Sequence, residues 1–407
     1  MIKNSLLALL LIIFVSCSSD DSSGGQNNNN PPVTGFTPCV NGVAGIYPCD
    51  GFDLLASMNL SEMSAASGND IWGWADLAHS KEYALVGLDN GTAFVDITDT
   101  ENLVYLGKLP TASSSSPWRD IKVYQDHAFI GAEANGHGMQ VFDLTNLRNV
   151  SNPPVNFTAD AVYNGFGNSH NIVINENTGF AYPVGTSRND AFNGGVHFID
   201  ISDPKNPAAA GGYGASGYTH DAQVVTYNGP DADYTGREIL IGANEAFIVL
   251  VDVTDKSNPT RISQIQYSNL GYTHQGWFTA DQRYFILGDE LDEINVGFNS
   301  RTLVFDFSDL DNPVFHATYS GPTSAIDHNG YVVGNQFYLA NYTAGIRVLD
   351  ISDIASGSLE EVGFFDTYTD NNTAAFEGVW SIYPFLPSGK IIVNDISSGL
   401  FVISASN

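Results

Sequence analysis

The chain has 407 residues, and 45 acidic residues against 15 basic ones give it a formal net charge of −30. This charge makes nucleic acid and anionic membrane surfaces poor partners and favours cations or basic surfaces, although it is equally well explained as a device for solubility. Forty glycines, 12% aromatic residues and only 15% charged residues are typical of many short strands joined by turns.

The N-terminus is predicted to direct export. Residues 1–16 carry one lysine and then an apolar run that is too short to span a membrane, which indicates a Sec-type signal. The small residue before Cys17 resembles a bacterial lipobox, so we expect a lipid on Cys17 that holds the protein to the membrane; an ordinary cleaved signal is the alternative. Residues 17–36 are polar and are expected to be a flexible tether. Asp20-Asp21 resembles the surface-export signal of Bacteroidetes lipoproteins, which implies an outer-membrane lipoprotein exposed at the cell surface.

Two cysteines remain after Cys17, and they lie close together in the sequence. In an oxidising compartment the short loop between Cys39 and Cys49 predicts a disulfide. A metal site formed by two lone cysteines is the weaker alternative. Loop-entropy reasoning gives such a bond about 2 to 3 kcal/mol of stability. Its reduction should loosen the N-terminal segment and leave the rest of the protein unchanged.

One apolar stretch that ends in aspartate recurs seven times. Its clearest copy is Gly-Ile-Arg-Val-Leu-Asp-Ile-Ser-Asp at residues 345–353. The first aspartate of successive copies is Asp96, Asp143, Asp200, Asp252, Asp306 and Asp350, with Ser404 in the seventh place. These positions lie 44 to 57 residues apart, the period of a propeller blade. Because the aspartates recur in most repeats, we expect them to build turns and not to catalyse a reaction.

The repeats predict an all-β fold, a seven-bladed β-propeller over residues 37–404 that we expect to be a monomer. Each repeat has the pattern of four short strands in an antiparallel meander, with the apolar signature as the third strand, buried on both faces. The last repeat stops after its signature strand and lacks a fourth strand. Residues 52–58 have the pattern to supply it, so an N-terminal strand should close the ring.

Longer motifs accompany the signature. The repeats resemble the LVIVD repeat, and the wider set resembles the choice-of-anchor B family of secreted bacterial proteins. The matching segments are residues 39–49, 118–123, 137–143, 218–223, 272–277 and 287–293. The resemblance implies an extracellular propeller whose relatives use different surface anchors, a lipobox being one of them. It implies no established activity and no catalytic residue.

Chemistry is expected at one face of the propeller, where the innermost strands begin and the turns between second and third strands return. Four successive repeats place a histidine at the start of the innermost strand, namely His170, His220, His274 and His328. Imidazoles and carboxylates are ligands for Zn²⁺, Mn²⁺, Fe or Cu, so this ring predicts a transition-metal site. Alternatively, each histidine ties down the preceding loop. Other residues expected to line this face are Arg119, Asp120, His137, Asp289, Glu290, Asp292 and Glu293.

A second candidate metal site lies in an acidic loop. Residues 231–236, Asp-Ala-Asp-Tyr-Thr-Gly, resemble the start of a calcium loop in which Asp231 and Asp233 would be ligands. The pattern is incomplete, because Gly242 stands where the last ligand should be. A plain acidic hairpin is the alternative.

Two classes of function remain open. The first is a cell-surface binding or scaffold lipoprotein that holds a glycan, a protein or an ion, with Trp72, Trp74 and Trp118 placed either to pack between blades or to stack on a sugar. The second is a metal-dependent hydrolase or oxidoreductase with Glu377 or Asp221 as general base. No nucleophile elbow, phosphate loop or dinucleotide fingerprint appears in the sequence.

Overall fold

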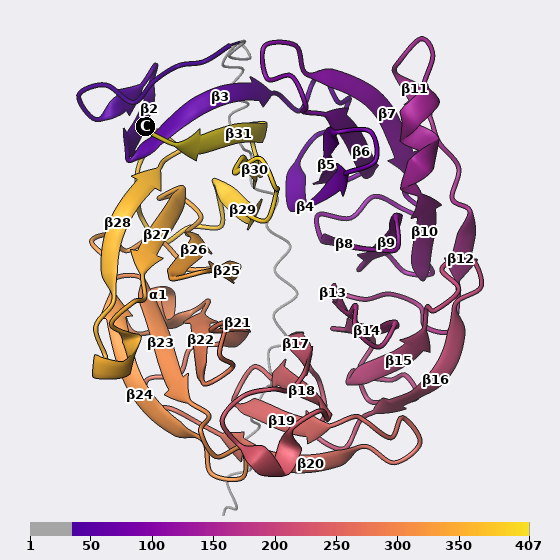
Figure 1. Cartoon of the computed structure of the whole chain (residues 1–407), viewed down its shortest axis with the longest axis vertical. Helices are drawn as coiled ribbons and strands as arrows, with labels where there is room; N and C mark the ends of the chain where they lie inside the picture. Colours follow the sequence, from indigo (N-terminus) through magenta and orange to yellow (C-terminus); the bar gives the residue numbers. More distant parts are fainter. Residues whose placement is uncertain (1–34, 407) are drawn as a thin grey trace, which may run out of the picture.

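The structure, a computed structural model, describes residues 35–406. Seven sheets surround a central axis, so the fold is the seven-bladed β-propeller predicted from the repeats (Figure 1). The predicted signal, Cys17 and all but the end of the tether lie outside the described residues. Within the described residues, no helix has the length and apolar character needed to cross a membrane.

The blades follow one another in chain order, and each runs from an inner strand at the axis to an outer strand at the rim. Blades one to three consist of β4 (Gly68–Asp76), β5 (Lys81–Leu88), β6 (Gly91–Asp96) and β7 (Val104–Pro110); β8 (Arg119–Tyr124), β9 (His127–Ala132), β10 (Met139–Asp143) and β12 (Ala161–Tyr163); and β13 (Asn171–Asn175), β14 (Phe180–Val184), β15 (Val196–Asp200) and β16 (Ala208–Tyr213). Blades four to six consist of β17 (Asp221–Thr226), β18 (Glu238–Ala243), β19 (Ile248–Asp252) and β20 (Thr260–Ile265); β21 (Thr273–Phe278), β22 (Tyr284–Asp289), β23 (Arg301–Asp306) and β24 (Val314–Ser320); and β25 (Gly330–Val333), β26 (Gln336–Ala340), β27 (Ile346–Asp350) and β28 (Glu360–Phe365).

The seventh blade combines the two ends of the chain. It contains β29 (Val379–Tyr383), β30 (Ile391–Asp395), β31 (Gly399–Ala405) and β3 (Phe52–Met58). Short elements extend the blades or connect their strands: β1 (Val43–Ala44), β2 (Tyr47–Asp50), β11 (Val155–Asn156), the helix α1 (Asp292–Asn295) and the 3-10 helices Leu144–Asn149, Ala232–Tyr234 and Ile354–Ser356.

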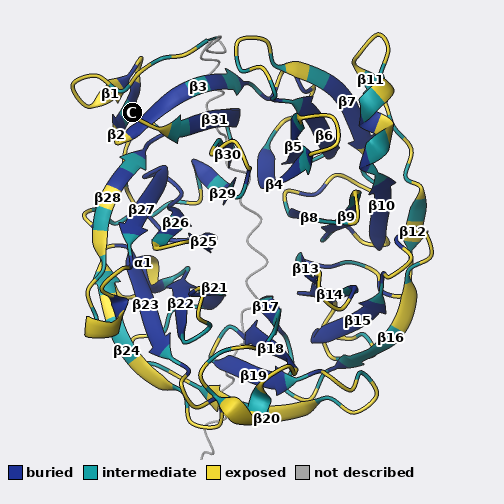
Figure 2. Cartoon of the chain, in the orientation of Figure 1, coloured by how far each residue is buried: buried dark blue, intermediate teal, exposed yellow. Residues whose placement is uncertain are grey.

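The signature strands are buried because a neighbouring blade covers each face. In β19, Ile248 and Leu250 pack in one apolar cluster with Phe285 of the fifth blade. Val249 and Val251 point to the opposite face, where they pack with Tyr182 of the third blade. Figure 2 shows buried strands inside the ring and exposed residues along its rim.

The recurring aspartates build turns, as their repetition predicts. The Asp252 Oδ1 atom accepts a hydrogen bond from the backbone N–H of Thr254 at 3.0 Å, and Asp255 accepts one from Ser257 at 3.0 Å. The first of these bonds recurs at Asp96, Asp143, Asp200, Asp306 and Asp350. These carboxylates therefore satisfy backbone donors at the strand-end face, the face where the inner strands end.

The predicted ring closure is confirmed by the pairing of β3 with β31. The two strands run antiparallel, with Leu54 opposite Ile403 and Met58 opposite Leu400. Leu54, Leu400 and Ile403 are fully buried. Because β3 covers the outer edge of β31, the N-terminal strand removes the sheet edge that the last repeat would otherwise expose.

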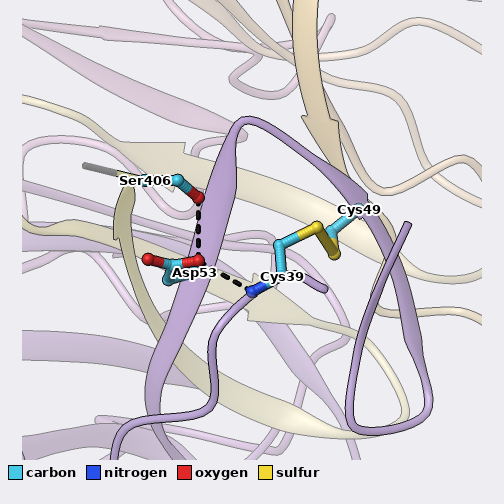
Figure 3. Close-up of a disulfide and its surroundings, with 4 residues drawn as sticks. All are labelled: Cys39, Cys49, Asp53 and Ser406. Carbon is cyan, nitrogen blue, oxygen red and sulfur yellow. Dashed lines mark hydrogen bonds between the residues drawn. A yellow bond between two sulfur atoms is a disulfide. The ribbon is translucent and has the colours of Figure 1, made fainter. Parts of the chain in front are cut away.

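The N-terminal segment is also fastened to the rim. The predicted disulfide joins Cys39 to Cys49, and β2 adds to the outer edge of the sixth blade by pairing with β28. Figure 3 shows the Asp53 carboxylate accepting hydrogen bonds from the Cys39 N–H at 2.8 Å and the Ser406 hydroxyl at 2.7 Å. Asp53 thereby ties the start of the propeller to its end.

Deleting residues 39–60 should cause the protein to aggregate, because the deletion removes β3 and leaves β31 as an apolar edge. The double variant Cys39→Ser/Cys49→Ser keeps β3 and serves as the control. It should stay soluble and lose only about 2 to 3 kcal/mol of unfolding free energy. Size-exclusion chromatography and thermal unfolding distinguish the two. A deletion variant that elutes as a monomer and melts cooperatively would contradict the closure argument.

Candidate metal centre

Four histidines meet at the strand-start face, the face where the inner strands begin. His170 and His220 directly precede β13 and β17, His274 is the second residue of β21, and His328 lies two residues before β25. Inner strands of successive blades pack side by side, so these positions come together. The ring centroids lie 4.2 Å apart for His170 and His220, 4.6 Å for His220 and His274, and 4.4 Å for His274 and His328. We call these four residues the histidine cluster.

Tight backbone contacts hold the strand starts in place. The His170 N–H donates to the carbonyl oxygens of Val184 and Gly185 at 3.0 and 3.1 Å. Gly185 has a φ of 61°, and a Cβ atom there would lie 2.2 Å from the His170 Cβ, so only glycine allows this approach. In the fifth blade, the Thr273 N–H donates to the Glu245 carbonyl oxygen of the fourth blade at 2.7 Å.

Three of the four imidazoles are oriented by a partner at Nδ1. The partner is the Glu133 carboxylate for His170 at 2.6 Å, the Tyr272 hydroxyl for His220 at 3.0 Å, and the Trp380 carbonyl oxygen for His328 at 2.5 Å. A carbonyl oxygen or a carboxylate only accepts hydrogen bonds, so Nδ1 of His328 and of His170 carries the hydrogen. The Nε2 atom of His328 is left with a free lone pair, because burial keeps this imidazole neutral, and Nε2 of His170 has one when that ring is neutral. This is the arrangement in which histidines bind metal ions.

Other ring nitrogens in the cluster are buried without a partner. His274 is 1% exposed, and neither of its nitrogens has a hydrogen bond; Nε2 of His220 is in the same position. An unsatisfied buried polar group costs about 1–3 kcal/mol. Ligand atoms of His170, His220 and His274 lie within 4.8 Å of one another, as do those of His274, Glu290 and His328. In each of these two groups the ligand atoms are therefore close enough to one another to share one bound ion.

Glu290 adds a carboxylate to the cluster. Its Oε2 atom lies 3.7 Å from Nε2 of His274, and its Oε1 atom lies 3.6 Å from Nε2 of His328. The Tyr342 hydroxyl donates to Oε1 at 3.0 Å and fixes the carboxylate. Burial raises the pKa of Glu290 to about 7. Nitrogen and oxygen donors are thus available at one point of the cluster.

Most of the cluster is neutral at physiological pH. Burial and the neighbouring imidazoles hold the pKa values of His220 and His274 well below the ordinary value, and burial lowers that of His328 to about 3. Burial also lowers the pKa of His170, but its bond to Glu133 and nearby negative charges outweigh that effect and raise it. A metal ion binds the neutral imidazole, so no proton has to leave His220, His274 or His328 first.

Arg119 and His137 do not line the open face, contrary to the sequence-based expectation. Both are buried between the first two blades. Arg119 donates from Nη1 to Nε2 of His137 at 3.1 Å and from Nε to the carbonyl oxygen of Leu88 at 3.0 Å. The second repeat carries an arginine where the next four carry histidine. This arginine binds one residue of the first blade and one of the second blade, and no cluster histidine.

Four acidic residues were predicted to line the open face. Three of them are buried, namely Asp289, Asp292 and Glu293. Of the four, only Glu290 reaches the histidines. Asp292 forms an ion pair with Arg301. Asp289 accepts hydrogen bonds from the backbone N–H groups of Gly271 and Tyr272 at 2.8 and 2.6 Å. Asp289 therefore shapes the loop that carries the Tyr272 hydroxyl to His220.

Neither of the two carboxylates predicted as general bases, Asp221 and Glu377, forms a hydrogen bond or ion pair with a cluster histidine in the described part of the chain. Asp221 accepts a hydrogen bond from the Ala222 N–H at 2.6 Å, and Asp120 forms an ion pair with Lys122 at 2.8 Å; both lie beneath the cluster in the wall of the central channel. Glu377 accepts a hydrogen bond from the Tyr368 hydroxyl at 2.8 Å, on the loop before β29.

The acidic loop of the fourth blade has a structural role. Asp231 caps a 3-10 helix by accepting the Asp233 N–H at 3.2 Å, and it also accepts the Leu310 N–H of the fifth blade at 2.8 Å. The carboxylates close to Asp231 are those of Asp309 and Asp311, and Asp233 is not part of that group. The pair predicted as calcium ligands is therefore not brought together as two carboxylates facing one ion.

The groups that orient the imidazoles are not among the residues predicted from the sequence. Tyr272, Tyr342 and the carbonyl of Trp380 all contact the cluster, yet none was predicted. A signal existed for Tyr272, because Tyr-Thr-His occurs at both residues 218–220 and residues 272–274. No pattern marks a backbone carbonyl such as that of Trp380.

A family model for the LVIVD repeat matches residues 331–367. The chain carries an LVIVD repeat. The matched segment coincides with the sixth blade, β25 to β28, so the repeat unit and the blade are the same. No curated protein matches the chain. The wider resemblance to the choice-of-anchor B family remains a prediction.

His137 should make the protein less stable in mild acid. Burial and the charge of Arg119 lower its pKa to about 4 in the folded protein, against 6.5 for an ordinary histidine. Between these values the unfolded chain binds the extra proton, so the free energy of unfolding falls as the pH is lowered from 6.5 to 4, by up to about 3 kcal/mol.

The variant His137→Gln tests this contribution. Glutamine can still accept the bond from Arg119 but does not titrate, so its unfolding free energy should depend less on pH across that window. Denaturant unfolding at several pH values measures the difference between the two proteins, which removes the parallel contributions of the other buried histidines. Equal pH dependence in wild type and His137→Gln would contradict this assignment.

Proposed function

We propose that this protein is an extracellular, lipid-anchored propeller that binds one transition-metal ion through the histidine cluster. The observation that carries the proposal is the set of four buried imidazoles from four successive blades, three of them held at Nδ1 so that Nε2 is presented to the cluster. A single ion on the axis would satisfy Nε2 of His220 and one ring nitrogen of His274, which otherwise lack any hydrogen bond.

The alternative, that each histidine ties down the loop before it, is less well supported. A shared structural role predicts the same hydrogen bond in every repeat. Instead, His170 binds a carboxylate of the second blade, His220 binds a tyrosine hydroxyl of the loop before β21, and His328 binds a carbonyl oxygen of the seventh blade. His274 forms no side-chain hydrogen bond with any described residue. What the four positions share is a nitrogen directed to the cluster.

The donor set indicates the class of ion. Imidazole nitrogen favours Zn²⁺, Fe²⁺, Cu²⁺ and similar ions over Ca²⁺ and Mg²⁺, which prefer oxygen ligands. Glu290 supplies one carboxylate beside two imidazoles. The net charge of −30 increases the local concentration of cations around the protein.

The proposed location rests on the predicted lipid at Cys17, the tether behind it and the use of cysteine. The bond between Cys39 and Cys49 suits an oxidising compartment outside the cytoplasm. The proposal is of binding and not of catalysis, because neither Glu377 nor Asp221 forms a hydrogen bond or ion pair with a cluster histidine in the described part of the chain.

Protein purified without chelator should contain about one equivalent of a transition metal by mass spectrometry, and apo protein should give a visible Co²⁺ spectrum on titration. His274→Ala should abolish both signals, because it removes the central imidazole. His79→Ala, which changes an exposed histidine, is the matched control and should retain them. Folding is checked by thermal unfolding.

Tyr272→Phe tests the orientation of His220. Loss of the hydroxyl partner should weaken metal binding about 10- to 100-fold, with little change in the melting temperature. Absence of metal from the wild-type protein together with failure to bind Co²⁺ would refute the proposal, as would equal binding by His274→Ala.

A further inference from the structure

A second site lies on the same axis, below the histidine cluster. A cavity of about 660 Å³ is lined by residues from the inner strands of all seven blades. The deep end of the cavity is lined by the residues that directly follow the cluster histidines in the sequence. The lining continues along the inner strands to Tyr124, Thr226 and Phe385 at the strand-end face. The volume lies within the range of about 300–1,000 Å³ that is usual for pockets that bind small molecules.

One side of the cavity is aromatic. We call Trp72, Trp277, Tyr331, Tyr383 and Phe385 the aromatic wall; they come from the first, fifth, sixth and seventh blades. Their rings contact one another, with centroids 4.8 Å apart for Trp72 and Tyr383 and 5.1 Å for Trp277 and Tyr331. Phe385, from the loop after β29, lies 5.8 Å from Tyr331 and 6.3 Å from Trp277. The result is a continuous apolar surface suited to the face of a ring-shaped ligand.

The deep end and the opposite side are polar. Residues that each directly follow Arg119 or a cluster histidine form the polar floor, namely Asp120, Asn171, Asp221, Gln275 and Asn329. Lys122 joins them, with its ammonium 2.8 Å from Asp120 and 4.5 Å from the centre of the Trp72 ring. Gln275 is engaged at both ends of its amide by the Gly330 backbone, and Asp120 is engaged by Lys122. Asn171, Asp221 and Asn329 are therefore the floor residues that can bind hydroxyl groups.

Several donors in the wall have no protein partner. The indole N–H groups of Trp72 and Trp277 and the hydroxyl of Tyr331 form no hydrogen bond with any residue among 35–406, although all three line the cavity. An indole N–H only donates, so its partner must carry a lone pair. An ammonium ion has none, whereas a hydroxyl group both donates and accepts.

The charge of the lining residues excludes further classes of ligand. Acidic residues outnumber Lys122, the one basic residue among the lining residues within the described chain. Four acidic residues against one lysine in the lining disfavour a phosphate, a sulfate or an acidic sugar. A neutral ligand with many hydroxyl groups and at least one apolar face satisfies both sides of the cavity.

We propose that this cavity binds a neutral sugar of one or two rings, stacked on the aromatic wall with its hydroxyl groups on the polar floor. The site is separate from the proposed metal centre and does not depend on it. The sugar would enter from the strand-end face, and the histidine cluster closes the other end of the channel.

The test uses the full-length chain and a panel of glucose, galactose, mannose, N-acetylglucosamine and disaccharides built from them. Saturation-transfer-difference NMR detects binding, and calorimetry measures affinity at sugar concentrations up to about 10 mM, enough to detect a Kd of about 1 mM. At least one sugar should bind. Tyr331→Phe, which removes only the hydroxyl, should weaken it about 3- to 10-fold, and Trp277→Phe should weaken it at least as much.

Two controls separate the possible outcomes. Trp118→Phe changes a partly exposed tryptophan outside the cavity lining and should leave sugar binding unchanged. Choline and putrescine are the organic cations for comparison. Failure of every sugar to bind, binding of the cations alone, or equal sugar affinity in Tyr331→Phe, Trp277→Phe and wild type would each overturn the proposal.

Discussion

Closure of the ring by β3 is the constraint on which the rest of the structure depends. The seventh blade has only three strands from the C-terminal part of the chain, and the backbone pairing of residues 52–58 with β31 completes it. Once seven blades form a closed ring, the starts of their inner strands must lie close to one axis. The contacts between imidazole rings of four different blades are a consequence of that geometry and not of local sequence.

The same closure explains the chemistry of the cluster. Imidazoles gathered at a crowded axis lose water, and burial keeps His220, His274 and His328 uncharged. The Nδ1 partners of His170, His220 and His328 come from other blades or from loops between blades, so the orientation of these three rings depends on the packing of neighbours. A neutral, oriented and unsatisfied set of nitrogens is costly in an empty protein and favourable around a cation.

The features that the repeats share could be predicted from the sequence. The signature strands, the aspartate turns and the missing fourth strand each follow from comparing copies, and the histidine cluster follows from four equal positions. Comparing repeats does not predict the positions at which the copies differ. Arg119 occupies the equivalent place in the second repeat, but its side chain forms hydrogen bonds with Leu88 and His137. Acidic residues after β22 looked alike in sequence, yet Glu290 contacts the histidines while Asp292 is used by Arg301. Such differences depend on burial and on partners distant in sequence.

We propose that one ion occupies the axis at the histidine cluster. Crystals of the full-length chain purified without chelator, measured at the absorption edge of the metal found in the protein, test it most directly. We predict one strong anomalous peak within about 2.0–2.3 Å of the Nε2 atoms of at least three cluster histidines. A map without a peak there, or with its peak at the carboxylates of Asp231, Asp309 and Asp311 instead, would contradict it.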